Sequence, residues 1–149
     1  MADLYRFSTP LRVRFNETDA QGHVNFAWYL NYFDVALIEY LRALGYSYND
    51  MLEEGFDMLY IDAHTAYKSA AYFDEILQVR CRVGKIGNTS LRFDFQVFDD
   101  AVSGRSLLAR SSWLSPSGIL IRRPRCRTAY GSQSKLTRDL RTNLEAKRR

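Results

Sequence analysis

The chain has few of the features that mark several common protein classes. Its only two cysteines, Cys81 and Cys126, form no CxxC pair and stand at no metal-binding spacing. No run of about 18 apolar residues is free of charge, so we expect no membrane-spanning helix. The opening residues, MADLYRFSTP, do not combine a basic start with an apolar run, so we expect no secretory signal. These absences favour a reduced, cytoplasmic protein.

Three motifs that bind nucleotides or place a nucleophile are also missing: GxxxxGK[ST], GxSxG and GxGxxG. Their absence argues against nucleotide hydrolysis, a serine hydrolase and a nicotinamide cofactor. Of the two histidines, His64 stands on a predicted strand without His or Asp partners at metal spacing. We therefore expect neither a cofactor nor a metal site.

What the chain does have is a core-forming composition and an uneven charge. It has 149 residues, of which 46% are hydrophobic, and this suits one domain. Residues 1–121 carry 11 Lys/Arg and 15 Asp/Glu, whereas residues 122–149 carry 10 Lys/Arg and 2 Asp/Glu. We expect a domain over residues 1–121 and a flexible basic tail over residues 122–149. The tail lacks aromatic interleaving beyond Tyr130, which makes nucleic acid a disfavoured partner.

The first half of the chain predicts a strand followed by a long helix. Residues 5–15 alternate between apolar and largely basic side chains, as in a half-buried strand. After a polar cluster, the segment NFAWYLNYFDVALIEYLRALG has apolar residues on nearly all sides at helical spacing. This predicts a helix of about five turns that is buried nearly all round. Asn25 is the expected N-cap, and Gly45 is expected just past the end near Leu44.

The second half is rich in strand patterns. A short helix is expected over residues 49–54, and strands over residues 58–68, 76–85, 90–99 and 105–114. Runs of strands around one helix predict an α+β fold with an antiparallel sheet. One flat sheet cannot surround a helix, so the sheet must curve strongly or a second subunit must cover the helix.

The stretch RVRFNETDAQGHVNFAWYLNYFDVALIEYLRALG resembles the opening of the 4-hydroxybenzoyl-CoA thioesterase-like acyl-CoA thioesterases. That family has the hotdog fold, in which a curved antiparallel sheet wraps one long central helix. It carries an aspartate in a (T/C)-D-x-x-G-(H/V)-V-(N/Y) setting directly before the helix. The matching residues here are Thr18, Asp19, Gly22, His23, Val24 and Asn25, followed by Tyr29, Tyr32 and Phe33. The resemblance covers residues 8–115; it departs at Phe26, where many members have a second Asn, and in the basic tail.

The resemblance implies hydrolysis of acyl-CoA thioesters, with Asp19 as general base or nucleophile. It places the oxyanion donors at the helix start, where free N–H groups and a partial positive charge polarise a carbonyl. By position, the backbone N–H of Phe26 is the expected donor, with Gly22 or His23 nearby. Without the resemblance, Asp19 fits a turn or an N-cap better than a catalyst, and His23 fits a turn.

The resemblance also suggests where the substrate is held. Tyr29 is expected near the acyl group, although an aromatic helix residue is more often part of the core. Glu17 is expected to be a solvated carboxylate two residues before Asp19. The phosphates of coenzyme A call for basic side chains or free N–H groups. The candidates are Lys68, Lys85, Asn88 and Ser90.

The resemblance also implies an assembly, and it leaves alternative functions open. The family builds its site between two subunits, which implies a homodimer or a homotetramer. One alternative is a thioesterase acting on acyl-carrier proteins, and another is a hotdog hydratase or dehydratase that uses His23 with an acidic partner. A non-catalytic protein that binds acyl thioesters is the third. The residues do not distinguish aryl from medium or long acyl groups.

Overall fold

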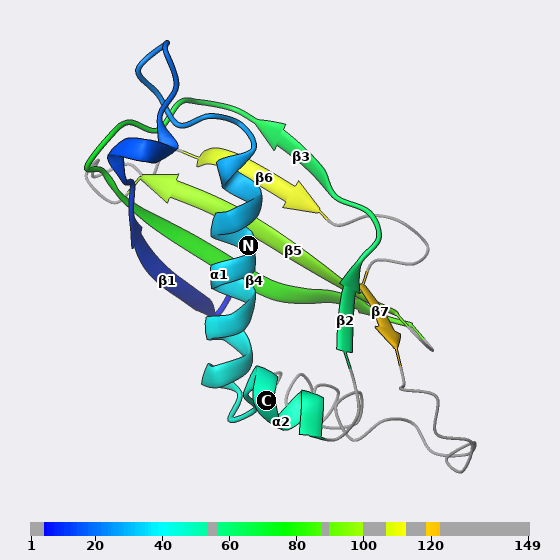
Figure 1. Cartoon of the computed structure of the whole chain (residues 1–149). Coiled ribbons are helices and arrows are strands. Elements are labelled where there is room, and N and C mark those ends of the chain that lie inside the picture. Colours follow the sequence, from blue (N-terminus) through cyan, green and yellow to red (C-terminus); the bar gives the residue numbers. More distant parts are fainter. Residues whose placement is uncertain (1–4, 54–56, 88–89, 100–106, 113–118, 123–149) are drawn as a thin grey trace.

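The protein is described here by a computed structural model that covers residues 5–53, 57–87, 90–99, 107–112 and 119–122. One seven-stranded antiparallel sheet curves across one side of a long helix, α1 (Trp28–Ala43) (Figure 1). The strands are β1 (Phe7–Arg12), β2 (Asp57–Tyr60), β3 (His64–Tyr67), β4 (Ile76–Ile86), β5 (Ser90–Asp99), β6 (Leu107–Ser112) and β7 (Ile119–Arg122). Their order is β1-β4-β5-β6-β3, and β7 pairs with both β2 and β5. The predicted α+β class is confirmed.

The alternation in the two longest strands places one set of side chains against the helix. Their inner residues are Leu77, Val79, Cys81 and Val83 in β4 and Leu91, Phe93, Phe95 and Val97 in β5, and all of them are buried. Burial of one large apolar side chain contributes about 1.5–3 kcal/mol. This inner face of the sheet is therefore the main source of stability.

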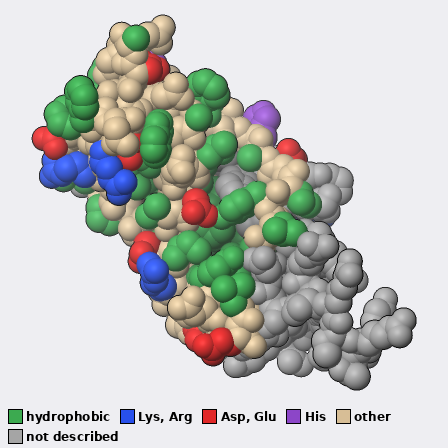
Figure 2. Space-filling view, in the orientation of Figure 1, with side chains coloured by type: hydrophobic (Ala, Val, Ile, Leu, Met, Phe, Trp, Pro, Cys, Tyr) green, Lys and Arg blue, Asp and Glu red, His purple; other side chains and the backbone are tan. Residues whose placement is uncertain are grey.

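The helix packs on that face through aromatic rings. The centroids of Phe33 and Phe95 lie 5.0 Å apart, and those of Tyr40 and Phe93 lie 6.3 Å apart. Within the single chain α1 is not buried all round, because Leu30 is 41% exposed and Val35 is 44% exposed, so the burial predicted for this helix would need a second subunit. The sheet covers only one side of the helix, and Figure 2 shows hydrophobic side chains at the surface over α1.

The two ends of α1 differ in how well the sequence predicts them. The helix begins at Trp28, later than expected, because the Asn25 side chain accepts the Ala27 N–H at 3.0 Å and closes a turn ahead of the helix. At the other end Gly45 has φ +77, and the Tyr46 N–H donates to the Leu41 carbonyl. This is a Schellman motif, as the position of the glycine predicts. In the described part of the chain, no helix is long and apolar enough to cross a membrane.

The segment predicted as one strand over residues 58–68 forms two. β2 pairs with β7, whereas β3 pairs with β6, so the two halves join different neighbours in the sheet. The sequence could not show this split, because it depends on a distant partner strand. The short helix is close to its predicted place, as α2 (Tyr48–Glu53). Residues 123–149, most of the predicted basic tail, lie outside the described residues.

One buried carboxylate lies on the outer face of the sheet. Asp94 is 6% exposed, and its Oδ2 accepts two hydrogen bonds from the Arg82 guanidinium, at 2.7 and 3.0 Å. Arg92 Nε lies 3.1 Å from its other oxygen. Gly84, at a bulge between β4 and β5, leaves the space that this carboxylate fills. A Cβ on Gly84 would fall 2.5 Å from Asp94 Oδ2.

We expect Gly84→Ala to lower the free energy of unfolding by about 1–3 kcal/mol, the range typical of overpacking. The carboxylate cannot move aside without loosening its two arginine partners. Urea unfolding measures the loss. The control is the same substitution in an Asp94→Ala background, where the obstruction is gone and the cost should shrink. An equal cost in both backgrounds would show that Asp94 is not the obstacle.

A second expectation concerns alkaline pH. Burial raises the pKa of Tyr29 from 10.0 to about 12. Between these values the folded protein keeps a proton that the unfolded chain releases, so the stability present below pH 10 is lost as pH rises to 12. Tyr29 alone should cost about 2–3 kcal/mol over this window. Urea unfolding below pH 10 and near pH 12 measures it, and Tyr29→Phe should reduce the slope. A pH-independent free energy of unfolding would contradict the expectation.

Candidate active site

The loop that carries the sequence motif is a small two-stranded turn. The Asn25 N–H donates to the Glu17 carbonyl at 3.0 Å, and the Asp19 N–H donates to the His23 carbonyl at 3.0 Å. A tight turn closes the tip, where the Gly22 N–H donates to the Asp19 carbonyl at 2.9 Å. Gly22 has φ +81, a conformation that glycine adopts without strain. The loop therefore has its own backbone frame.

This loop is also fixed to a distant part of the chain. The Val24 N–H donates to the Ala71 carbonyl at 2.8 Å, and His23 forms an isolated antiparallel bridge with Tyr72. The segment after β3 thereby holds the loop beside the start of α1 (Figure 1). No local sequence pattern predicts this contact, since it joins residues nearly 50 positions apart.

The two oxygens of the Asp19 carboxylate have different surroundings. Oδ1 accepts a hydrogen bond from the Gln21 N–H at 2.8 Å, as in an Asx turn. Oδ2 lies 3.8 Å from His23 Nδ1, which is too far for a hydrogen bond. Among the described residues, no donor reaches Oδ2. The turn role expected from the residues alone is present, and one oxygen remains available for chemistry.

The predicted oxyanion donor, the Phe26 N–H, lies just before the start of α1. The Phe26 N–H has no acceptor among the described residues, and the Phe26 side chain is 67% exposed. The Phe26 carbonyl accepts a hydrogen bond from the Tyr67 hydroxyl at 2.9 Å. Tyr29 is 2% exposed, and its ring centroid lies 5.3 Å from that of Tyr67. Phe26, Tyr29 and Tyr67 thus form an aromatic cluster at the helix start.

Tyr67 is a site residue that the sequence reasoning missed. It lies on β3, about 40 residues after Phe26, and nothing in its local pattern separates it from other strand aromatics. Only a signal that pairs distant positions could have found it.

Glu17 contradicts the expectation of a solvated carboxylate, because it is only 3% exposed. Its Oε2 accepts hydrogen bonds from the Tyr32 hydroxyl at 2.7 Å and from the Arg14 N–H at 2.8 Å. An extended strand through Glu17 and Asp19 would place both side chains on the same face. The chain instead forms a 3-10 turn over Phe15–Glu17, which directs Glu17 inward.

The candidate coenzyme A residues do not gather in one place. Lys68 is exposed and directly follows Tyr67, near the loop. Lys85 and Ser90 flank the β4–β5 turn, which Figure 1 shows at the opposite end of the sheet from the loop. Asn88 lies outside the described residues. Of the candidates that the structure describes, only Lys68 adjoins the β3 residue that contacts the helix start.

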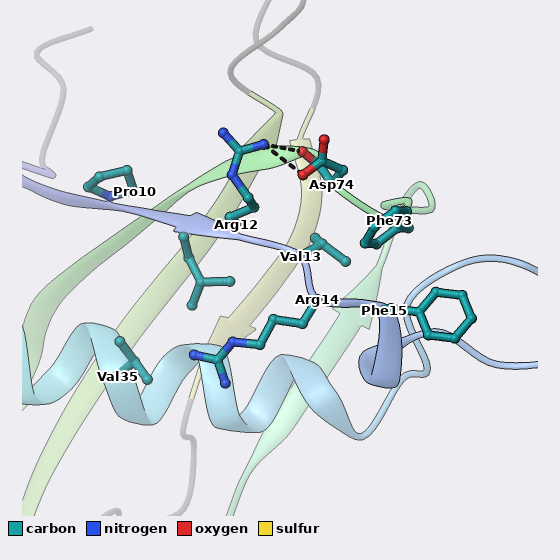
Figure 3. Close-up of a pocket in the computed structure, with 9 residues that line it drawn as sticks. Pro10, Arg12, Val13, Arg14, Phe15, Val35, Phe73 and Asp74 are labelled. Atoms are coloured by element: carbon teal, nitrogen blue, oxygen red, sulfur yellow. Dashed lines mark hydrogen bonds and ion pairs between the residues drawn. The ribbon is translucent and has the colours of Figure 1, made fainter.

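An open groove of about 610 Å³ lies between β1, α1 and the segment that precedes β4 (Figure 3). It is lined by Pro10, Leu11, Arg12, Val13, Arg14, Phe15, Val35, Phe73 and Asp74. Arg12 Nη1 donates to both the carbonyl and the carboxylate of Asp74, so an exposed ion pair forms part of the groove's lining. Asp19 and His23 do not line this groove, which is therefore not the motif site.

Metal ligands do not gather around the loop. Among the described residues, no group of three or more His, Cys, Asp or Glu side chains is arranged to hold a metal ion. The described groups at the loop that could take part in chemistry include the Asp19 carboxylate, the His23 imidazole and the Phe26 N–H at the helix start.

Comparison with known proteins places this geometry in a family. Residues 13–112 match the sequence model of the thioesterase-like superfamily. The acyl-CoA thioesterase YbgC of Haemophilus influenzae is 36% identical over 90 residues, which are 59% of this chain and 65% of that protein. A solved structure of an Aquifex aeolicus protein is 29% identical, with a TM-score of 0.65, covering 71% of this chain and 83% of that chain.

A DHNA-CoA thioesterase of Staphylococcus aureus has the same fold, with a TM-score of 0.76. It is 21% identical, and the match covers 93% of this chain and 90% of that one. The predicted resemblance and the hotdog fold are confirmed. The chain belongs to the thioesterase-like superfamily.

Proposed function

We propose that the chain hydrolyses acyl-CoA thioesters, with Asp19 as the reactive carboxylate. The observation that carries the proposal is the asymmetry of that carboxylate. Oδ1 is held by the Gln21 N–H, while Oδ2 meets no donor among the described residues. The unpaired Phe26 N–H at the start of α1 supports the second half of the proposal, an oxyanion donor beside it. The acyl-CoA thioesterase named among the relatives supports the substrate class.

Two routes would use the same oxygen. In the first, Oδ2 takes a proton from water as the water attacks the thioester carbonyl. The tetrahedral oxyanion collapses, the C–S bond breaks, and coenzyme A leaves as a thiol with the acid as co-product. In the second, Oδ2 itself attacks, forms an acyl anhydride and expels the thiolate, and water then cleaves the anhydride. In both routes the helix-start N–H groups stabilise the charge on the carbonyl oxygen.

Binding of the acyl group is assigned to the aromatic cluster at the helix start. Phe26 is exposed and lies edge-on to Tyr67, while Tyr29 is buried behind them. Two exposed rings, Phe26 and Tyr67, backed by the buried ring of Tyr29 suit an apolar or aromatic acyl chain. Lys68, the next residue after Tyr67, is the proposed contact for a coenzyme A phosphate. Lys85 and Ser90 would meet the same ligand only across a subunit boundary.

A homo-oligomer is part of the proposal. Leu30 and Val35 expose apolar side chains on α1, and Phe15 and Phe73 do so beside the loop. Exposed apolar side chains gathered on one side of a small protein are typical of association surfaces. Association with a second copy would cover the helix face that the single sheet leaves open.

The hydratase alternative rests on one observation, the 3.8 Å separation of His23 Nδ1 and Asp19 Oδ2. A His–carboxylate pair could serve proton transfer to an enoyl thioester. Product analysis separates the two functions: a hydratase leaves the thioester intact, whereas a hydrolase releases the thiol.

We expect Asp19→Asn to lower kcat by at least about 100-fold, which corresponds to about 2.7 kcal/mol of barrier. Asn keeps an oxygen for the Gln21 N–H, so the loop should remain folded. Thiol release from short, medium, long and aromatic acyl-CoAs measures the loss and identifies the preferred acyl group. Because Cys81 and Cys126 also react with thiol reagents, a control without substrate corrects the measured amount of coenzyme A thiol. An inactive wild type, or full activity of Asp19→Asn, would sink the proposal.

A matched pair of glycines tests the loop. Gly22 and Gly45 both have positive φ, and a Cβ would meet no atom within 4 Å at either position. Alanine at each should therefore cost about 1–2 kcal/mol of stability through backbone strain alone. Only Gly22→Ala should also lower kcat, because only Gly22 shapes the turn that carries Asp19. Urea unfolding and thiol release measure the two effects. Equal kcat values for the two variants would show that the turn at Gly22 does not contribute to catalysis.

A further inference from the structure

Glu17 is a buried carboxylate without a close cation. Apart from Asp94, it is the only buried charged residue among the described side chains. Asp94 is neutralised by two arginines, whereas Glu17 Oε1 has only Arg14 Nη1 at 3.9 Å, and the Arg14 side chain is 74% exposed. Burying a carboxylate without close neutralisation works against stability. A contribution to stability therefore accounts for the burial of Asp94 better than for the burial of Glu17.

The contacts of Glu17 converge on one oxygen. Oε2 accepts both from the Tyr32 hydroxyl, in the second turn of α1, and from the Arg14 N–H, at the end of the first strand. Tyr32 is 2% exposed, and its pKa is raised well above 10.0 by burial and by the bond to Glu17. The hydroxyl therefore stays protonated and remains a donor over the whole range in which a thioesterase would be assayed.

The backbone of Glu17 closes the loop that carries Asp19. Its carbonyl accepts the Asn25 N–H, so Glu17 closes the frame whose tip carries Asp19. The same residue thus binds the helix through its side chain and the loop through its main chain. Any shift of Glu17 would change how Asp19 faces the start of α1, where Phe26 presents its N–H.

We propose that Glu17 is a positioning residue, which holds the Asp19 carboxylate in register with the oxyanion donors by anchoring the loop to Tyr32. This inference rests on the proposed function, since it assumes that Asp19 is the reactive group. It assigns no contact with substrate to Glu17, which is buried. Its effect passes through the geometry of Asp19, and a displacement of about 1 Å at a reacting group can cost about 100-fold in rate.

The first test compares two tyrosines on the same helix. Tyr32→Phe removes the bond to Glu17, and we expect kcat to fall about 10-fold with little change in KM. Tyr40→Phe is the matched control, since Tyr40 is also nearly buried, is bonded to the backbone at Val83 and lies in the last turn of α1, at the end opposite the loop. It should lose stability without losing kcat. If Tyr32→Phe keeps the kcat of the wild type, the proposal is wrong.

The second test separates hydrogen bonding from charge. The Gln oxygen of Glu17→Gln can take the place of Oε2 and accept both bonds, so kcat should stay within about 3-fold of wild type. Glu17→Ala removes both bonds and should lose about 100-fold in kcat. If the Ala variant does not fold, Tyr32→Phe decides, because it leaves the Arg14 bond in place.

The third test asks whether the effect passes through Asp19. In an Asp19→Asn background, Tyr32→Phe and Glu17→Ala should add no further loss in kcat, because nothing reactive is left to position. Losses that multiply in that background would overturn the proposal. A wild type without thioesterase activity, or an active Asp19→Asn, would instead show that the proposed function itself is wrong. Asp19→Asn inactive with Tyr32→Phe fully active would refute the positioning role alone.

Discussion

The packing of one face of α1 on the inner face of the sheet is the constraint on which the rest of the structure depends. The stacked rings of Phe33 and Phe95 fix the helix on the central strands. Because the helix is rigid, this contact also fixes where its first turn lies relative to the sheet. The motif loop and the segment after β3 are then brought to that turn. The position of the candidate site is therefore a consequence of core packing.

Two buried carboxylates show how differently one fold can hold a charge. Asp94 lies between two arginines on the outer face, and the space it needs exists because residue 84 has no side chain. Glu17 is satisfied by one hydroxyl and one backbone N–H, which meet its charge less completely. The first arrangement resembles a structural ion pair. The second lies where the loop that carries Asp19 begins, since the Glu17 carbonyl accepts the Asn25 N–H.

The candidate site itself is assembled from segments that are far apart in the chain. Asp19 and Phe26 come from one short stretch, but Tyr67 and the backbone of Ala71 hold that stretch in place. The single chain still leaves part of α1 exposed and keeps Lys85 away from the loop. A second copy of the chain would cover the exposed part of α1. It could also bring its own β4–β5 turn, with Lys85, to the loop of the first copy.

Features that depend on local periodicity could be predicted from the amino-acid sequence. Alternation defined β4 and β5, the glycine at residue 45 ended the helix, and the motif around Asp19 indicated the family. Tertiary structure decided the rest: the burial of Glu17, the contact of Tyr67 and the division of residues 58–68 between two strand partners. These features depend on which distant segments pair and in which register. A pattern within one segment reports its own exposed and buried sides, but it carries no information on the partner that covers them.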